Sequence, residues 1–122
     1  MKQLSEVWRR GVVVPLTNDS ANEMAQFAVS SEAEALCLPI DTDALFYEIW
    51  ATNLFQDINR SCGVLIDDYE EEKLPPEALG AALTVVSNHL SKARSQVFSF
   101  LKELEKMIKE AIKLSFPVYF IL

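Results

Sequence analysis

The sequence has few of the residues from which catalytic and metal sites are usually built. Its 122 residues include two cysteines, one histidine and three glycines. Cys37 and Cys62 have no second cysteine pair to complete a structural zinc site. His89 lies among polar residues near the end of an amphipathic stretch, and no catalytic triad can be argued from its spacing. We therefore expect no enzymatic activity, no required metal and no cofactor.

Long apolar runs are also missing. No run approaches the roughly 18 residues that a membrane span needs. The first six residues lack the apolar core of a signal peptide. The three glycines, Gly11, Gly63 and Gly80, are too dispersed to form a phosphate-binding loop. These absences favour a cytoplasmic protein without a membrane partner.

Hydrophobic residues, in contrast, are plentiful and make up 50% of the chain. This share is enough for a core without disulfides, so we expect Cys37 and Cys62 to be reduced and buried. The length suits one domain, spanning residues 1–122.

Acidic residues are concentrated in the middle of the chain. The net charge is −7, and residues 41–72 hold nine acids and one arginine, a local balance of 1 − 9 = −8. The nine are Asp41, Asp43, Glu48, Asp57, Asp67, Asp68, Glu70, Glu71 and Glu72. Such a region repels nucleic acid and attracts basic proteins or divalent cations. We expect no direct nucleic-acid binding.

Hydrophobic periodicity predicts an α+β fold, with about three main helices packed on a small, mostly antiparallel sheet. The expected strands are residues 12–16, 35–40 and 118–122, the first near a sheet edge because Pro15 cannot donate to a ladder. The expected helices are residues 21–29, which is short, and 44–61, 75–91 and 94–114. The helix over residues 44–61 is expected to be central, and Gly63 to close it in the left-handed conformation.

The stretch from Gly63 to Pro76 divides the aromatic-rich half of the chain from the two later helices. Five carboxylates surround Tyr69 within six residues, and such crowded like charges are poor material for a strand or a helix interior. We expect the run to project into solvent. It is either a solvated loop or a docking surface for a basic partner, with Tyr69 as an anchor.

Residues 65–79, the two helices that follow and the closing residues 115–122 resemble the small acidic immunity proteins of bacterial contact-dependent growth inhibition and other polymorphic toxin systems. The resemblance covers about the C-terminal half of the chain. It implies a cytoplasmic protein that binds and neutralises a cognate toxin domain, frequently a basic nuclease.

These observations together predict a binding protein that occludes the substrate-binding surface of its partner. Two alternatives stay open: a cation-dependent hydrolase that uses Asp67 and Asp68 as acid and base, and a general acidic regulatory adaptor. The predicted partner-binding residues are Asp67, Asp68, Tyr69, Glu70, Glu71 and Glu72, joined by Asp57 and Glu48.

Overall fold

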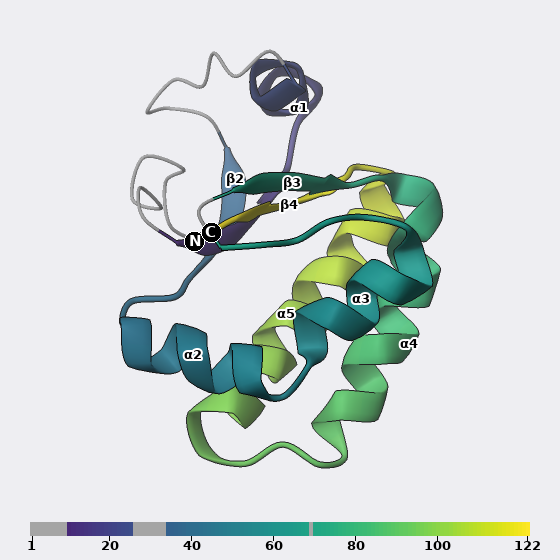
Figure 1. Cartoon of the computed structure of the whole chain (residues 1–122). Coiled ribbons are helices and arrows are strands. Elements are labelled where there is room, and N and C mark those ends of the chain that lie inside the picture. Colours follow the sequence, from purple (N-terminus) through teal and green to yellow (C-terminus); the bar gives the residue numbers. More distant parts are fainter. Residues whose placement is uncertain (1–9, 26–33, 69) are drawn as a thin grey trace.

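Four strands and five α-helices make up the part of the chain described by the computed structural model, residues 10–25, 34–68 and 70–122 (Figure 1). The strands are β1 (Gly11–Pro15), β2 (Ala35–Pro39), β3 (Glu71–Leu74) and β4 (Val118–Ile121). The helices are α1 (Asn18–Ala25), α2 (Asp43–Ala51), α3 (Leu54–Cys62), α4 (Leu79–Leu90) and α5 (Ser95–Leu114), with a short 3₁₀ turn, η2 (Pro76–Ala78), before α4. The α+β class is confirmed, but five helices replace the predicted three or so.

The sheet is antiparallel throughout, with the strand order β2-β1-β4-β3. All three predicted strands are present, and the C-terminal strand β4 lies between β1 and β3. The edge position predicted for the first strand is wrong, since β1 pairs on both sides. Pro15 is tolerated because β4 pairs with β1 only over Gly11–Val13, so the proline lies beyond the end of β4.

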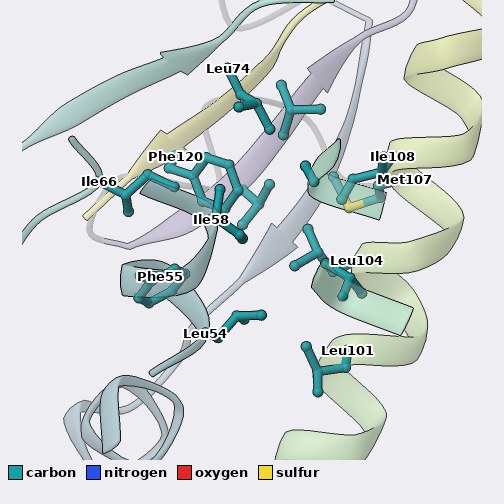
Figure 2. Close-up of a cluster of buried hydrophobic side chains, with 14 of the residues drawn as sticks. Leu54, Phe55, Ile58, Ile66, Leu74, Leu101, Leu104, Met107, Ile108 and Phe120 are labelled. Atoms are coloured by element: carbon teal, nitrogen blue, oxygen red, sulfur yellow. The ribbon is translucent and has the colours of Figure 1, made fainter. Parts of the chain in front are cut away.

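The core lies between the sheet and the helices α3, α4 and α5, which pack on one face (Figures 1 and 2). Phe120 of β4 is fully buried, and its ring meets Phe55 of α3 edge-on at 6.0 Å between centroids. On the opposite face a smaller cluster joins Val13 and Tyr119 to Met24 of α1. Leu74 of β3 belongs to the same cluster as Phe55, so β3 and α3 are attached to one core.

The central helix predicted over residues 44–61 is two helices, α2 and α3. The Thr52 hydroxyl donates to the Ile49 carbonyl at 2.6 Å and accepts from the Leu54 amide at 3.2 Å. Between them Asn53 adopts a left-handed conformation, with φ at 66°. Thr52 supplies hydrogen bonds to the backbone groups at this break, and Asn53 provides the left-handed conformation. The chain therefore changes direction without glycine or proline.

The predicted solvent loop also needs correction, because Glu71 and Glu72 belong to the edge strand β3. Each residue of β3 is paired with β4, from Glu71 opposite Ile121 to Leu74 opposite Val118. Leu74 is fully buried and holds the strand to the core. An edge strand needs only one face against the core, and charged residues are well tolerated at such an edge.

Two local predictions at the end of α3 have different outcomes. Gly63 is left-handed, with φ at 70°, and its amide donates to the Asn59 carbonyl at 2.9 Å, as predicted. Cys37 and Cys62 are thiols, also as predicted, but each is half-buried instead of buried. The first helix starts earlier than predicted, at Asn18, and its predicted end at Val29 lies outside the described residues.

Candidate functional site

The segment that joins α3 to β3 is fixed at its centre by Asn59. The Asn59 side-chain amide donates to the Ile66 carbonyl at 3.0 Å, and the Ile66 amide donates back to Asn59 Oδ1 at 2.7 Å. Ile66 itself is buried in the core. Its neighbours Leu65 and Asp67 are exposed, and Leu65 retains 75% of its accessible surface. The segment is thus held in place while it presents a leucine and a carboxylate to solvent.

In the described part of the acidic run, residues 67, 68 and 70–72, the side chains of Asp68 and Glu72 contact groups outside the run. The Asp68 carboxylate lies 3.1 Å from Arg10, whose guanidinium stacks 3.7 Å above the Phe46 ring and also faces Asp43 at 3.8 Å. The Arg10 side chain is only 9% exposed. Glu72 turns back along the segment and accepts the Leu65 amide. Asp68 and Glu72 therefore help to hold the segment.

The remaining described carboxylates of the run face solvent. Asp67, Glu70 and Glu71 are exposed. Within the described residues no hydrogen bond or ion pair occupies the carboxylates of Glu70 and Glu71, whereas Asp67 accepts the neighbouring Asp68 amide at 2.7 Å. We call Leu65, Asp67, Glu70 and Glu71 the acidic edge. Tyr69, the predicted anchor, lies outside the described residues.

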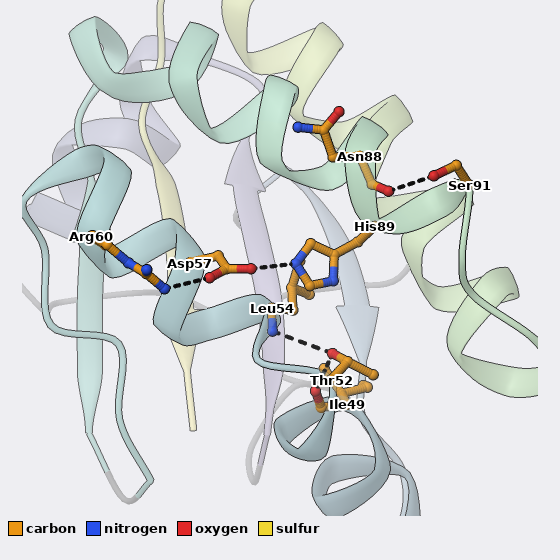
Figure 3. Close-up of polar contacts among 8 residues, drawn as sticks. All are labelled: Ile49, Thr52, Leu54, Asp57, Arg60, Asn88, His89 and Ser91. Atoms are coloured by element: carbon orange, nitrogen blue, oxygen red, sulfur yellow. Dashed lines mark hydrogen bonds and ion pairs between the residues drawn. The ribbon is translucent and has the colours of Figure 1, made fainter.

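Asp57 and Glu48, the other two predicted partner-binding residues, are located elsewhere. Glu48 is exposed on α2, and no hydrogen bond or ion pair in the described ranges joins it to the acidic edge. Asp57 of α3 faces α4 (Figure 3): Oδ1 lies 2.6 Å from Arg60, and Oδ2 lies 2.7 Å from His89 Nε2. The structure therefore places Asp57 in a charged cluster with His89.

This cluster forms the wall of two adjoining hollows between the helices. One, of about 420 Å³, has Asp57, His89 and Lys92 on its wall. The other, of about 320 Å³, shares these three residues. The remaining lining residues of the first are Thr52, Asn53, Ala93, Val97 and Leu101, and those of the second are Arg60, Ser61, Val85 and Asn88. We call the pair the helical hollow.

His89 was not among the predicted site residues. It lies 32 positions from Asp57 in the sequence, and only the packing of α4 on α3 brings the two together. With Asp57 as the acceptor, Nε2 carries the proton that donates to Oδ2, and Nδ1 is left as the second polar atom of the ring. The contact fixes the orientation of the imidazole in the wall of the helical hollow.

Burial raises the pKa of two groups in the described residues, Cys62 and Tyr119. Partial burial raises the pKa of the Cys62 thiol at the end of α3 and that of the Tyr119 phenol in the sheet, because it disfavours both anions. Cys62 donates to the Ala78 carbonyl, with its sulfur 3.5 Å away. The raised pKa makes Cys62 a poor nucleophile at neutral pH.

No cluster of three or more histidine, cysteine or acidic side chains suited to a metal ion occurs in residues 10–25, 34–68 and 70–122. None of the helices in these ranges is long and apolar enough to cross a membrane. No family model, curated protein or solved structure matches the chain.

Proposed function

We propose that this chain is a protein-binding module whose acidic edge docks on a basic protein. The observation that carries the proposal is the exposure of Asp67, Glu70 and Glu71 on the same stretch of chain that exposes the side chain of Leu65. Exposed like charges without compensating cations favour association with a basic surface. An exposed leucine inside such a surface supplies apolar area that binding can bury.

The proposed partner is a cognate toxin domain, and the proposed role is immunity to that toxin. The resemblance of residues 65–79 and 115–122 to acidic immunity proteins supports this reading, as does the net charge of −7. A nuclease binds the phosphates of its substrate through lysines and arginines. Carboxylates laid against those side chains would block the entry of nucleic acid, which accounts for neutralisation by occlusion.

Charge and apolar contact contribute to different steps of this binding. Long-range attraction raises the association rate, to about 10⁸ to 10⁹ M⁻¹s⁻¹ at low salt in favourable cases. Buried side chains at the centre of an interface slow dissociation. Leu65 is the described residue suited to that second role, and Tyr69 stays a prediction for it. An interface of about 1,600 Å² is expected.

The two alternatives receive less support from the contacts described above. A cation-dependent hydrolase would use Asp67 and Asp68 as a pair, whereas Asp68 is already bound to Arg10. A general regulatory adaptor would use the same acidic edge. The adaptor and the immunity protein differ in the partner, because only the immunity protein protects a cell from a toxin.

The test reverses charge at the acidic edge and leaves the structural carboxylates Asp68 and Glu72 unchanged. In the variant Glu70→Lys/Glu71→Lys, association with the toxin domain encoded by the neighbouring gene should slow by about 10²-fold at low salt. A matched control, Glu103→Lys/Glu110→Lys, changes the net charge equally but on α5. Stopped-flow association rates at two salt concentrations compare the two variants.

The expected result is a slower association and a weaker salt dependence for the edge variant only, with loss of protection in cells that produce the toxin. Both variants should unfold within about 0.5 kcal/mol of the parent, because Glu70, Glu71 and Glu103 are exposed and Glu110 is only partly buried. Equal association of the two variants would place the interface away from the acidic edge. Wild-type protein that fails to bind the toxin domain would refute the immunity role.

A further inference from the structure

We propose that the helical hollow binds the phosphate group of a small phosphomonoester whose organic part rests on the apolar floor of the hollow. This site is separate from the acidic edge and does not depend on the proposed toxin partner. Three features carry the inference: a local excess of cationic side chains, an oriented imidazole, and a division of the lining into a charged rim and an apolar floor.

The charges around the helical hollow are opposite in sign to those of the protein as a whole. Its lining contains Arg60, Lys92 and His89 but a single acid, Asp57. Both oxygens of Asp57 are engaged, one by Arg60 and the other by His89. Lys92 has no ion pair within the described part of the chain. With histidine counted as neutral, Arg60 and Lys92 stand against Asp57, a formal local balance of 2 − 1 = +1. In a protein of net charge −7, this local positive balance favours contact with an anion.

His89 is placed to take part in such a contact. Its side chain is 16% exposed and lines both hollows. Asp57 fixes the ring through Nε2–H, which leaves Nδ1 as the acceptor atom of the ring. A phosphate oxygen that accepts from the Lys92 ammonium would make one charge-assisted hydrogen bond, and the P–OH of a phosphate monoanion would donate a second hydrogen bond to Nδ1.

The floor of the larger hollow is suited to the organic part of the ligand. Val97 and Leu101 of α5 are almost completely buried beneath it, and Ala93 adds a third apolar residue. A volume of about 420 Å³ exceeds what an inorganic phosphate ion requires, and it lies within the size range of small-molecule sites. A phosphomonoester with an aromatic or aliphatic group therefore fits the lining better than the free ion does.

The experiment titrates the complete chain with phenyl phosphate and follows the imidazole resonances of the single histidine by NMR. We expect a saturable shift of the His89 signals with a Kd of about 1 mM, and weaker binding of inorganic phosphate, which lacks the apolar part. Phenol supplies the ring without the charge and should leave the signals unchanged. Equal shifts with phenol and phenyl phosphate, or no saturable shift up to about 20 mM phenyl phosphate, would overturn the proposal.

Variants separate a specific site from general attraction between charges. Lys92→Met removes the ammonium of the rim and should raise the Kd at least about fivefold. Lys113→Met removes an exposed lysine at the far end of α5 and should leave the Kd unchanged. Equal Kd values for both variants and the parent would refute the site. Arg60→Gln serves as a second rim variant if Lys92→Met shifts the thermal unfolding midpoint.

Discussion

The acidic edge and the helical hollow both contain carboxylates, but these differ in whether other side chains contact them. At the acidic edge, the carboxylates of Glu70 and Glu71 make no hydrogen bond or ion pair with the described residues. In the helical hollow, Asp57 lies between Arg60 and His89, at 2.6 and 2.7 Å. The two regions are joined by α3, which has Asp57 in its middle. After Gly63 the chain continues into the stretch that contains the acidic edge.

The number of acids in a stretch of sequence does not decide their role. Asp57 and Asp68 counted toward the acidic surface in the sequence, yet each is bound by a side chain that arrives from another part of the fold. Arg10 comes from the start of β1, and His89 comes from α4. What distinguishes a binding surface from a structural contact is the set of partners that the fold brings to each carboxylate.

The largest expected effect comes from breaking the core that holds both regions. Phe120→Ala removes a fully buried ring that packs on Phe55 of α3 and should cost about 3–5 kcal/mol. This is a large part of the roughly 5–15 kcal/mol by which a small domain is stable. Phe98→Ala, at an exposed aromatic of α5, should cost less than about 1 kcal/mol.

Urea denaturation followed by tryptophan fluorescence and by the NMR signals of His89 measures both variants. Coincident transitions would show that the core beside Trp50 of α2 and the helical hollow belong to one cooperative unit. A His89 transition that is unaffected in Phe120→Ala would mean that the two regions unfold independently.

A paired substitution of two aspartates addresses the difference between the regions directly. Asp57→Asn removes the charge between Arg60 and His89 and should cost about 1–2 kcal/mol, because a hydrogen bond between charged groups is lost at a partly buried position. Asp67→Asn keeps the oxygen that accepts the Asp68 amide and should change stability by less than about 0.5 kcal/mol. Unfolding free energies in urea check both. Equal costs would show that Asp57 is no more structural than Asp67.

Asn53, where α2 ends and α3 begins, offers a smaller effect. Its φ of 66° is unfavourable for a residue with a Cβ, so Asn53→Ala should destabilise by about 1 kcal/mol, whereas Asn53→Gly should be nearly neutral. Both variants remove the side chain that lines the helical hollow, so their difference isolates the backbone. Thermal unfolding midpoints compare them, and an alanine variant as stable as the glycine variant would contradict this account of the break between α2 and α3.

The parts of the fold that the sequence predicts are those defined by local periodicity. The strands at Val12, Leu36 and Val118 are short runs of apolar residues, and α4 and α5 carry apolar residues at helical spacing. Such patterns reflect which side of an element is buried, and burial is what stabilises the element. They state nothing about which elements are neighbours.

Two of the features that were missed depend on contacts between distant residues, and a third depends on the hydrogen bonds of one side chain. β3 has one fully buried residue, Leu74, and forms because β4 lies beside it. The separation of α2 from α3 depends on the side chain of Thr52, which bonds to the backbone on both sides of the turn. The pair of Asp57 and His89 exists only after α4 packs on α3. Spacing of charges along the chain contains no signal for any of these contacts.

The smallest effect concerns Cys62, located where α3 passes from the helical hollow to the acidic edge. Burial raises the pKa of its thiol, so the folded protein holds the thiol proton to a higher pH than the unfolded chain does. The resulting stabilisation is fully present below the thiol pKa of the unfolded chain and is lost as pH rises through the higher pKa of the folded state.

In a Cys37→Ser background, the rate of alkylation of Cys62 by iodoacetamide should therefore rise at a higher pH in the folded protein than in urea. The unfolding midpoint should also fall slightly above about pH 8.5, and Cys62→Ala should remove this part of the pH dependence. Identical pH profiles of alkylation in the folded and unfolded chain would show that the Cys62 thiol is as accessible to water as a thiol in an open peptide.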